Sequence, residues 1–586
     1  MSDCLLTDLV DWKKSEPSAI ALAQKGSDGN WSTLSTTDYA KKVGQVACSL
    51  ESLGWRPGDR ALILARNCPE WLFVDLGVGL AKGICGGLYN NSSLDDFYHV
   101  FQLVKPRILF VEDADAFARI PIASTKSVER IVTFRGEADF DDRAMSFEVF
   151  LSLGKSVRKC FEDLVNGFDS SQPSFIVFTS GTTGAPKAAL LSHDNIYFAA
   201  SCYRNRWNAP AEGKLYSFLP ASHVAEKVYS LGHGLHFRYP VYFASDLTNV
   251  LAEMREVQPL AFLATPRIWQ KIMEKVQLGL SRVNSGVAAK LLKQARSLSV
   301  ESIEQRFRGQ KLPLFKRIYF AYLDKKILLP IRTKLGLSKT IKAVSGAAAL
   351  PENVRHFFRG LGINIIEAYG QTESSGILSG QLGDEDCAGT IGFPVPELEV
   401  KISEEGELMT KGRHVFCGYL DSQSATDEVL KEGWLHTGDL AEWNANGQIV
   451  FIGRRRDIIK PLEGKMIAPT KIEAKLMLSE VISQAVVFGD GEKFLIALLS
   501  PDLSRPSTKE QLNLEISNFV RTLNRSLARH ERIQKYLVLD REFSMENGEL
   551  TPTLKTKRYA IKQNFKPEIE RMYGRNSDLE GGSLYL

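Results

Sequence analysis

The sequence predicts an α/β protein with parallel strands buried between helices, followed by a smaller α/β module. Apolar runs at 61–64 and 107–111 alternate with a helical pattern at 38–53. This alternation is typical of βαβ units around a buried parallel sheet. A strand-like run at 260–264 repeats the pattern, and the composition becomes charged and polar near Arg454. The change at Arg454 predicts a domain boundary.

Composition limits the classes of function that the chain can have. The 586 residues are 44% hydrophobic and 24% charged, with a formal net charge of +4. These values are typical of a globular protein with several folding units. The small net charge gives no indication that nucleic acid is a partner. The eight cysteines form no CxxC pair and no zinc-type spacing, which predicts free thiols. Because the first residues lack the pattern of a secretory signal, the default expectation is a cytoplasmic enzyme.

A hydroxyl- and glycine-rich loop at 178–187 is the most informative motif. It follows a β-rich run at 174–178 and precedes a second apolar run at 188–191. Its glycines allow the backbone N–H groups to approach an anion, while hydroxyls and Lys187 add donors and charge. A triphosphate is the expected ligand. The order of residues differs from a Walker loop, which disfavours an ordinary phosphoryl-transfer NTPase.

The next helix is predicted to begin at Asn195, with Asp194 as its N-cap. Further along, residues 362–370 predict a strand that leads into a loop. The segment of about 275–340 is expected to be a helical insertion rich in basic residues. Within it, residues 311–320 interleave cations with aromatic and aliphatic groups. Two interpretations stay open: a membrane-surface patch, or a solvated amphipathic helix packed on the body.

Four later segments suit the same nucleotide chemistry. Residues 368–373 offer an aromatic ring, a hydroxyl and a carboxylate, and residues 433–440 place a carboxylate in a turn that could accept ribose hydroxyls. Residues 453–460 supply guanidinium groups, and residues 549–558 present lysines far along the chain.

With these motifs in order, the chain resembles the adenylate-forming superfamily, and most closely its long-chain fatty acyl-CoA synthetases. Family phrases occur at Lys460 to Pro469, Leu550 to Lys555 and Ala264 to Trp269. The resemblance implies an α/β fold with a large N-terminal domain of two doubly wound sheets and a small barrel-like sheet. A small mobile α+β domain would follow. The implied domains are 1–454, for AMP and acyl binding, and 455–586, which carries the catalytic lysine.

The resemblance implies an AMP-forming, long-chain fatty acid-CoA ligase that uses ATP, Mg²⁺ and coenzyme A. Residues assigned by it to catalysis are Lys555, Glu373, Thr182 and His223. Those assigned to binding ATP or coenzyme A are Thr179, Ser180, Gly181, Thr183, Gly184, Lys187, Gly346, Ala347, Ala348, Glu367, Ala368, Tyr369, Gly370, Thr372, Asp439, Arg454, Arg456 and Gly464. The metal ligands would be Thr182 and Glu373.

Individual roles follow from the same resemblance. The loop of Thr179 to Lys187 would hold the β- and γ-phosphates, Tyr369 would stack on adenine, and Gly346 to Ala348 would line the base pocket. Asp439 and Arg454 would hold the ribose.

The remaining roles concern the two half-reactions. Lys555 would reach the α-phosphate during adenylation. Arg456 would be the hinge about which the small domain rotates, exchanging Lys555 for Gly464 so that pantetheine can enter. His223 has two interpretations, either near the substrate carboxylate or purely structural.

Two alternatives remain besides the ligase: an acyl-AMP ligase that loads a carrier protein, and a lipid-binding scaffold without chemistry. A luciferase-like oxygenase is disfavoured, since no segment marks an oxygen-handling site. Acyl length, a homodimer and peripheral association with the inner face of a membrane are left open by the sequence.

Overall fold

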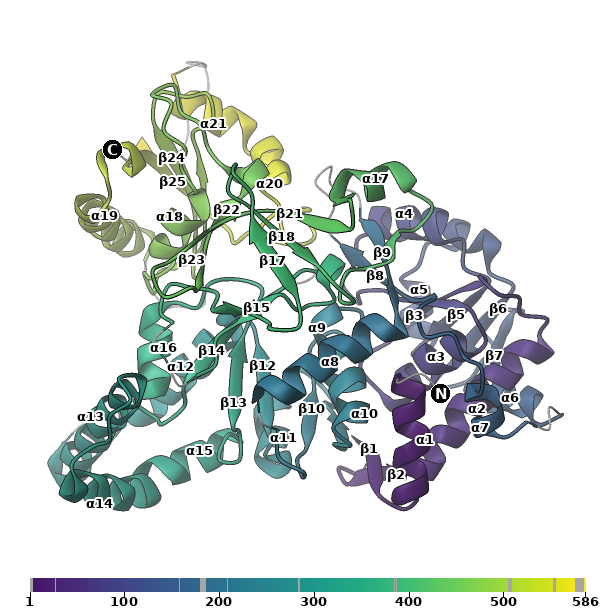
Figure 1. Ribbon diagram of the computed structural model, residues 1–586. Helices are drawn as coiled ribbons and strands as arrows, with labels where there is room; N and C mark the ends of the chain where they lie inside the picture. The colour runs from purple at the N-terminus through teal and green to yellow at the C-terminus, as the bar shows by residue number, and fades with distance from the viewer. Residues whose placement is uncertain are drawn as a thin grey trace.

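The computed structural model describes residues 4–26, 28–156, 159–179, 186–207, 209–282, 285–383, 385, 387–503, 508–551, 555–574 and 584–585. Figure 1 shows a large body of sheets and helices, with the C-terminal segment stacked above it at the upper left. The α/β class predicted from the sequence is confirmed.

An eight-stranded sheet forms the first half of the body, in the order β19-β9-β8-β4-β3-β5-β6-β7. Its strands are β3 (Arg60–Leu64), β4 (Ile84–Gly87), β5 (Ile108–Val111), β6 (Arg130–Thr133), β7 (Ala144–Ser146), β8 (Pro173–Thr179), β9 (Lys187–Ser192) and β19 (Gly418–Tyr419). The pairs from β8 through β7 are parallel, whereas β8–β9 and β9–β19 are antiparallel. Ala61 and Ile63 point into one core while Leu62 and Leu64 point into another, so both faces of the sheet are buried.

Helices cover both faces of this sheet. They are α1 (Leu5–Ser15), α2 (Thr36–Ser52), α3 (Pro69–Leu80), α4 (Leu94–Val104), α5 (Ala114–Ala118), α6 (Phe147–Leu153), α7 (Phe161–Val165) and α8 (His193–Trp207). The predicted start of α8 was wrong. The helix begins at His193, because Ser192 Oγ accepts from the Asn195 N–H at 3.0 Å and caps the first turn. Asp194 instead pairs with Arg413.

Two further sheets stand where the second doubly wound sheet was expected. One has the order β10-β11-β1-β2, and the other has the order β12-β13-β14-β15-β16. Their strands are β1 (Ile20–Lys25), β2 (Trp31–Ser35), β10 (Leu215–Ser217), β11 (Val241–Phe243), β12 (Ala261–Ala264), β13 (Lys342–Ser345), β14 (Ile365–Tyr369), β15 (Ser379–Gly380) and β16 (Phe393–Pro394). Trp269 and Phe358 lie fully buried in the core beside them.

Helices of this half include α9 (Val224–Glu226), α10 (Gly234–His236), α11 (Val250–Val257), α12 (Pro266–Leu280) and α16 (Glu352–Arg359). A π-helical segment, η3 (Lys227–His233), joins α9 to α10. The predicted insertion is helical as α13 (Gly286–Phe307), α14 (Leu314–Leu323), the π-helical turn Asp324–Leu328 and α15 (Leu329–Leu335). In Figure 1 these helices form an arm at the lower left that reaches away from the sheets.

An antiparallel sheet links the body to the C-terminal module. It consists of β17 (Glu399–Ile402), β18 (Glu407–Lys411), β20 (Leu430–Lys431), β21 (Trp434–Trp443) and β22 (Ile449–Arg454), with α17 (Gln423–Val429) beside it. Within it, β21 and β22 place Asp439 directly opposite Arg454.

The C-terminal module has its own mixed sheet, in the order β23-β24-β25-β26. Its elements are α18 (Pro469–Leu476), β23 (Ile482–Phe488), β24 (Leu495–Pro501), α19 (Lys509–Ser526), β25 (Ile533–Val538), α20 (Arg558–Asn564), α21 (Lys566–Met572) and β26 (Leu584–Tyr585). Val486 and Val487 point into different cores, so helices bury both faces of this sheet as well.

None of the eight cysteines forms a disulfide, as the sequence predicted. Within the described part of the chain, no helix combines the length and apolar character needed to cross a bilayer.

Candidate active site

A cavity of about 990 Å³ lies where the body meets the C-terminal module. Its lining residues come from distant parts of the chain, from Leu88 to Lys557. One part is polar and the other is apolar. Predicted site residues in the lining are Thr179, Lys187, His223, Gly346, Ala347, Ala368, Gly370, Thr372, Glu373, Asp439, Arg454, Arg456 and Lys555.

The loop predicted to bind phosphate is described only at its two ends. Thr179 ends β8 and Lys187 begins β9, and both border the cavity. The predicted residues Ser180, Gly181, Thr182, Thr183 and Gly184 lie outside the described residues.

Lys187, Tyr419 and Glu373 form a connected group on one wall. The Lys187 ammonium lies 5.0 Å from the centroid of the Tyr419 ring. The Tyr419 hydroxyl donates a hydrogen bond of 2.7 Å to Glu373 Oε1. Burial and the neighbouring Glu373 carboxylate raise the pKa of Tyr419, so its hydroxyl remains a donor. Tyr419 was missed in the sequence, because only the pairing of β19 with β9 brings it here.

Glu373 fits a magnesium ligand. Its Oε2 accepts no hydrogen bond from the described residues, and the residue borders the cavity. An open carboxylate oxygen at the border of the cavity is the hard donor that Mg²⁺ prefers. No group of three or more His, Cys, Asp or Glu side chains that could hold a metal ion occurs among the described residues.

Asp439 is fixed by three neighbours and keeps one acceptor open. Tyr369 Oη and Gln371 Nε2 both donate to its Oδ2, the latter at 2.7 Å. Its Oδ1 is buried and accepts no hydrogen bond within the described structure, and Arg454 Nε lies 3.6 Å away. Burial raises the pKa of Asp439, although Arg454 opposes this effect. An oriented, unsatisfied carboxylate oxygen suits the hydroxyl groups of a ribose.

Two predicted binding residues have other contacts. The Tyr369 ring lies 6.0 Å from the Phe451 ring, and the residue is not among those that line the cavity. Glu367 is buried, pairs with Arg355 and accepts from the Leu350 N–H at 3.0 Å. Glu367 therefore does not line the cavity, and its contacts stabilise the wall of the site.

The segment predicted to line a base pocket contributes in part to the cavity lining. Gly346 and Ala347 border the cavity, whereas Ala348 does not. Ala347 has a left-handed backbone, with φ 72°. At Gly370 a side chain would be excluded, because its Cβ would lie 2.3 Å from the carbonyl carbon of Gly376. The backbone at Gly370 consequently packs directly against that of Gly376, and both glycines border the cavity.

Lys555 extends into the cavity from the C-terminal module. Its loop is closed by hydrogen bonds in both directions with Thr551, at 2.7 and 3.0 Å. The residue as a whole is exposed, yet protein atoms surround its amine closely enough to desolvate it. Desolvation and the nearby Arg454 lower the pKa of Lys555 to about 8, although Asp439 and Glu373 favour its charged form. The lysine thus faces the groups predicted to hold the nucleotide.

His223 lies at the border between the polar and the apolar parts. Its Nδ1 accepts from the Ala225 N–H at 3.2 Å and caps α9. Burial, followed by the charge of Lys555, lowers the pKa of His223 to about 4, so the ring is neutral near pH 7. The contact supports the structural interpretation, and a role near a substrate carboxylate stays a prediction.

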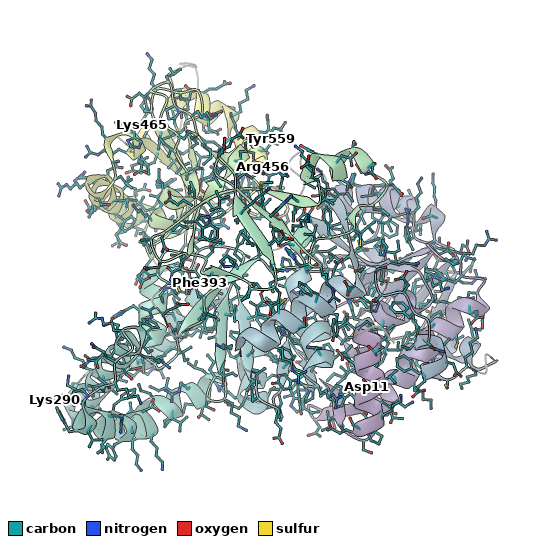
Figure 2. The ribbon with its side chains drawn as sticks, in the orientation of Figure 1. Asp11, Lys290, Phe393, Arg456, Lys465 and Tyr559 are labelled. Atoms are coloured by element: carbon teal, nitrogen blue, oxygen red, sulfur yellow. The ribbon has the colours of Figure 1, made fainter. Side chains whose placement is uncertain are left out.

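Arg456 borders the cavity, whereas Gly464 does not. Figure 2 shows Arg456 where the green antiparallel sheet meets the C-terminal module. Gly464 lies in an open turn with φ 79°, and no atom would meet a side chain there within 4 Å. In this arrangement the structure brings Lys555 into the cavity and leaves Gly464 outside it.

The apolar part of the cavity runs along α9 and η3. Its lining includes Tyr203, Val224, Val228, Tyr229, His233, Ala261, Leu263, Ile268 and Ile272. At another edge the lining residues Leu247, Lys271 and Lys275 are exposed, so the cavity also reaches the surface between α11 and α12. A cavity of this shape suits an extended aliphatic chain.

Buried charges anchor the opposite side of the same helical segment. Lys227 pairs with Asp75, and both side chains are only 2% exposed. Glu226 accepts from Ser217 and Ser230, and burial raises its pKa to about 7. Because breaking a buried pair is costly, this network holds the apolar wall in a defined position.

Comparison with known proteins gives consistent matches along the chain. The AMP-binding enzyme family profile matches residues 9–420, and the AMP-binding enzyme C-terminal domain profile matches residues 456–577. The chain is 30% identical over 570 residues to the long-chain-fatty-acid–CoA ligase FadD15 of Mycobacterium bovis, covering 94% of this chain and 93% of that protein. It is 30% identical over 613 residues to the human long-chain-fatty-acid–CoA ligase ACSBG1, covering 94% and 83%.

Solved structures share the fold. The A-PCP didomain of carboxylic acid reductase from Segniliparus rugosus, in complex with AMP, superimposes with a TM-score of 0.76 at 19% identity, covering 98% of this chain and 82% of that one. ATP-bound MatB from Rhodopseudomonas palustris gives a TM-score of 0.68 at 18% identity, covering 97% and 99%.

Proposed function

The chain belongs to the AMP-binding enzyme family, and from this premise we propose that it is a fatty acid-CoA ligase. In the first half-reaction, a fatty acid carboxylate oxygen attacks the α-phosphorus of ATP. An O–P bond forms and pyrophosphate leaves. In the second, the sulfur of coenzyme A attacks the acyl carbonyl, a C–S bond forms, the C–O bond to AMP breaks, and the thiol proton passes to solvent.

The observation that carries this proposal is one cavity with two chemically different parts. Lys187, Glu373 and Asp439 border the polar part, and Val228 and Tyr229 border the apolar part. Lys555 and His223 lie where the two parts meet, close enough for the charge of Lys555 to affect the pKa of the imidazole. A reacting carboxylate at this junction has its chain in the apolar part and its oxygens beside cations.

Charge placement supports the chemistry of the first half-reaction. A carboxylate that approaches a phosphate meets another anion, so fixed cations must be present where negative charge develops. Lys555 would neutralise negative charge at the α-phosphate, and Lys187 would neutralise negative charge on the departing pyrophosphate. Asp439 Oδ1 would accept from the ribose, which orients the nucleotide.

We extend the proposal to Mg²⁺, held by Glu373 and Thr182. When bound, the ion supplies charge neutralisation for the phosphate oxygens. The free Glu373 Oε2 supports this assignment.

The domain organisation is proposed as 1–454 and 455–586, with a rotation at Arg456 between the two half-reactions. Among the described residues, Arg455 at the boundary pairs with Glu405 and, at 3.6 Å, with Glu407, and Arg267 pairs with Glu542 at 3.8 Å. Few ion pairs would therefore have to break when the module turns.

The finer assignments are a long-chain acyl preference and a cytoplasmic location at the inner face of a membrane. The names of the relatives support the first. The free cysteines agree with a reducing compartment. We also propose a homodimer, and a measurement of the oligomeric state in solution tests it.

AMP release is the test of the proposed reaction. Purified protein is assayed with ATP, Mg²⁺ and coenzyme A against fatty acids from short to very long. We expect turnover that depends on coenzyme A and is greatest for long chains. Pyrophosphate release that does not respond to coenzyme A would instead assign a carrier-protein acceptor. Absence of pyrophosphate exchange with every acid would favour the non-catalytic scaffold.

A further inference from the structure

The outer face of α14 is apolar, which is unusual for a helix at the surface. Its members recur at helical spacing and are large: Leu314, Phe315, Ile318, Tyr319 and Tyr322. We call them the α14 face. Four of them are 59–71% exposed and Tyr319 is 41% exposed. Residues three and four apart share one side of a helix, so these side chains form a continuous strip.

The opposite side of α14 already has its partners. Leu323 is fully buried and Phe320 packs against the same core. Lys316 turns toward α13, where it pairs with Glu301 at 2.7 Å. The helix is thus fixed on the arm by one side, and the α14 face remains directed to solvent.

A solvated amphipathic helix, one of the two interpretations of the sequence, would expose its polar side. Instead, α14 has apolar residues on both sides, and its outward strip is the more aromatic one. Exposed apolar strips of this kind mark contact surfaces.

Positive charge surrounds the α14 face. Between residues 308 and 334 there are eight cations and one acid, although the net charge of the whole chain is only +4. The acid, Asp324, pairs with Arg332. Four cations around the face form no ion pair in the described part of the chain: Lys311, Arg317, Lys325 and Lys326. We call these four the basic rim.

The arm places this surface at the periphery of the molecule. Figure 1 shows α14 at the lower left, at the far end of the arm from the sheets. Lys290 of α13 projects outward from the same end in Figure 2. A flat partner could therefore reach α14 without meeting the body.

We propose that the α14 face and the basic rim form a docking surface for an anionic phospholipid bilayer. Aromatic and aliphatic side chains would enter the headgroup and upper acyl region, while the lysines and arginine would contact anionic headgroups. A second copy of the chain fits less well, because a symmetric pairing of this face would bring two basic rims together. The proposal assigns a surface to the membrane location proposed above, and it does not depend on the ligase reaction.

The experiment is co-sedimentation of the full chain with vesicles. One set contains phosphatidylcholine and phosphatidylglycerol, and the other contains phosphatidylcholine alone. We expect binding to the anionic vesicles at least about tenfold stronger than to the neutral ones, and a decrease as salt is raised. Equal binding to both sets, or no binding, would overturn the proposal.

Two double variants separate the contributions. Phe315→Ser with Ile318→Ser removes apolar area, and Lys325→Glu with Lys326→Glu reverses charge. Each should weaken binding to anionic vesicles by about tenfold or more. All four residues are exposed, so the thermal midpoint should stay near that of the unmodified chain.

Matched controls use equally exposed residues elsewhere. Leu94→Ser with Leu514→Ser removes side chains that are 62% and 63% exposed, and Lys465→Glu with Lys562→Glu reverses two exposed lysines. Both controls should bind vesicles like the unmodified chain. If they lose binding equally, the effect is general charge or hydrophobicity and α14 has no special role. If Phe315→Ser with Ile318→Ser instead converts an oligomer to a monomer, the face is a protein interface and the lipid proposal fails.

Discussion

At the scale of single residues, Lys555 has an environment unlike that of an ordinary surface lysine. It lies in a cavity beside Arg454, which opposes its charge, and near Asp439 and Glu373, which favour it. Lys557 also borders the cavity, whereas Arg558 pairs with Glu473. The three cations of this short segment thus have different contacts, and the sequence alone did not reveal those contacts.

Replacing Lys555 tests its role in adenylation. Lys555→Ala should lower acyl-AMP formation about 100- to 1,000-fold, because a preorganised cation is lost from the transition state. Thioester formation from supplied acyl-AMP should change little. Pyrophosphate exchange and acyl-AMP consumption measure the two steps, with Lys562→Ala on α20 as a control. Equal loss of both steps would contradict the assignment.

The lowered pKa of Lys555 predicts a pH dependence. The protonated amine is the active form, so adenylation measured as kcat/KM should fall as pH rises through about 8. His223, with a pKa of about 4, is neutral throughout this range and does not contribute. Lys555→Arg should move the decline to higher pH, because guanidinium stays charged. A profile that is the same in both proteins would exclude Lys555 as the titrating group.

At the scale of elements, the segment from α9 through η3 combines two roles. Val228 and Tyr229 line the apolar part of the cavity, while Glu226 and Lys227 hold the other side through buried polar contacts. The wide π-helical turn changes which residues face the cavity. The sequence shows no sign of this geometry.

The segment predicts a change in chain-length preference. Val228→Trp should fill the apolar part and shift the ratio of kcat/KM for short over long acids by at least about tenfold, since such pockets discriminate methylenes by packing. Tyr203→Ala should shift this ratio the opposite way, because it removes a ring from the cavity lining. The Tyr203 ring lies 5.3 Å from that of His233, and both residues line the cavity. Tyr203→Phe, which keeps the ring, is the control. Ratios that do not move would place the acyl chain elsewhere.

At the scale of the whole molecule, the arrangement of the body and the C-terminal module is suited to adenylation. Lys555 is inside the cavity and Gly464 is outside it. The proposed exchange of Lys555 for Gly464 in the second half-reaction would reverse this placement, and few ion pairs join the two parts among the described residues.

A side chain at Gly464 tests that rotation. Gly464→Leu should leave pyrophosphate exchange nearly unchanged and lower thioester formation at least about tenfold, because the side chain would occupy the path of pantetheine. Backbone strain is controlled by Gly447→Leu, since Gly447 has a similar φ of 76° and open space around it. Normal thioester formation in Gly464→Leu would rule out this role for the turn.

Motif order in the sequence was sufficient to predict the α/β class, the family and several residues of the polar part of the cavity. Hydroxyls, glycines and cations that bind phosphate are local features of short segments, so they can be recognised without a structure. The free cysteines and the helical insertion were predicted on the same basis.

Other properties depend on contacts between distant segments. The bond of Tyr419 with Glu373, the support of the wall by Glu367, the lowered pKa of Lys555 and the apolar outer strip of α14 were decided by tertiary structure. Each depends on which side of a strand or helix meets a segment far away in the chain, and local pattern does not contain that information. The sequence therefore determined the chemistry available to this protein, whereas packing determined where each group acts.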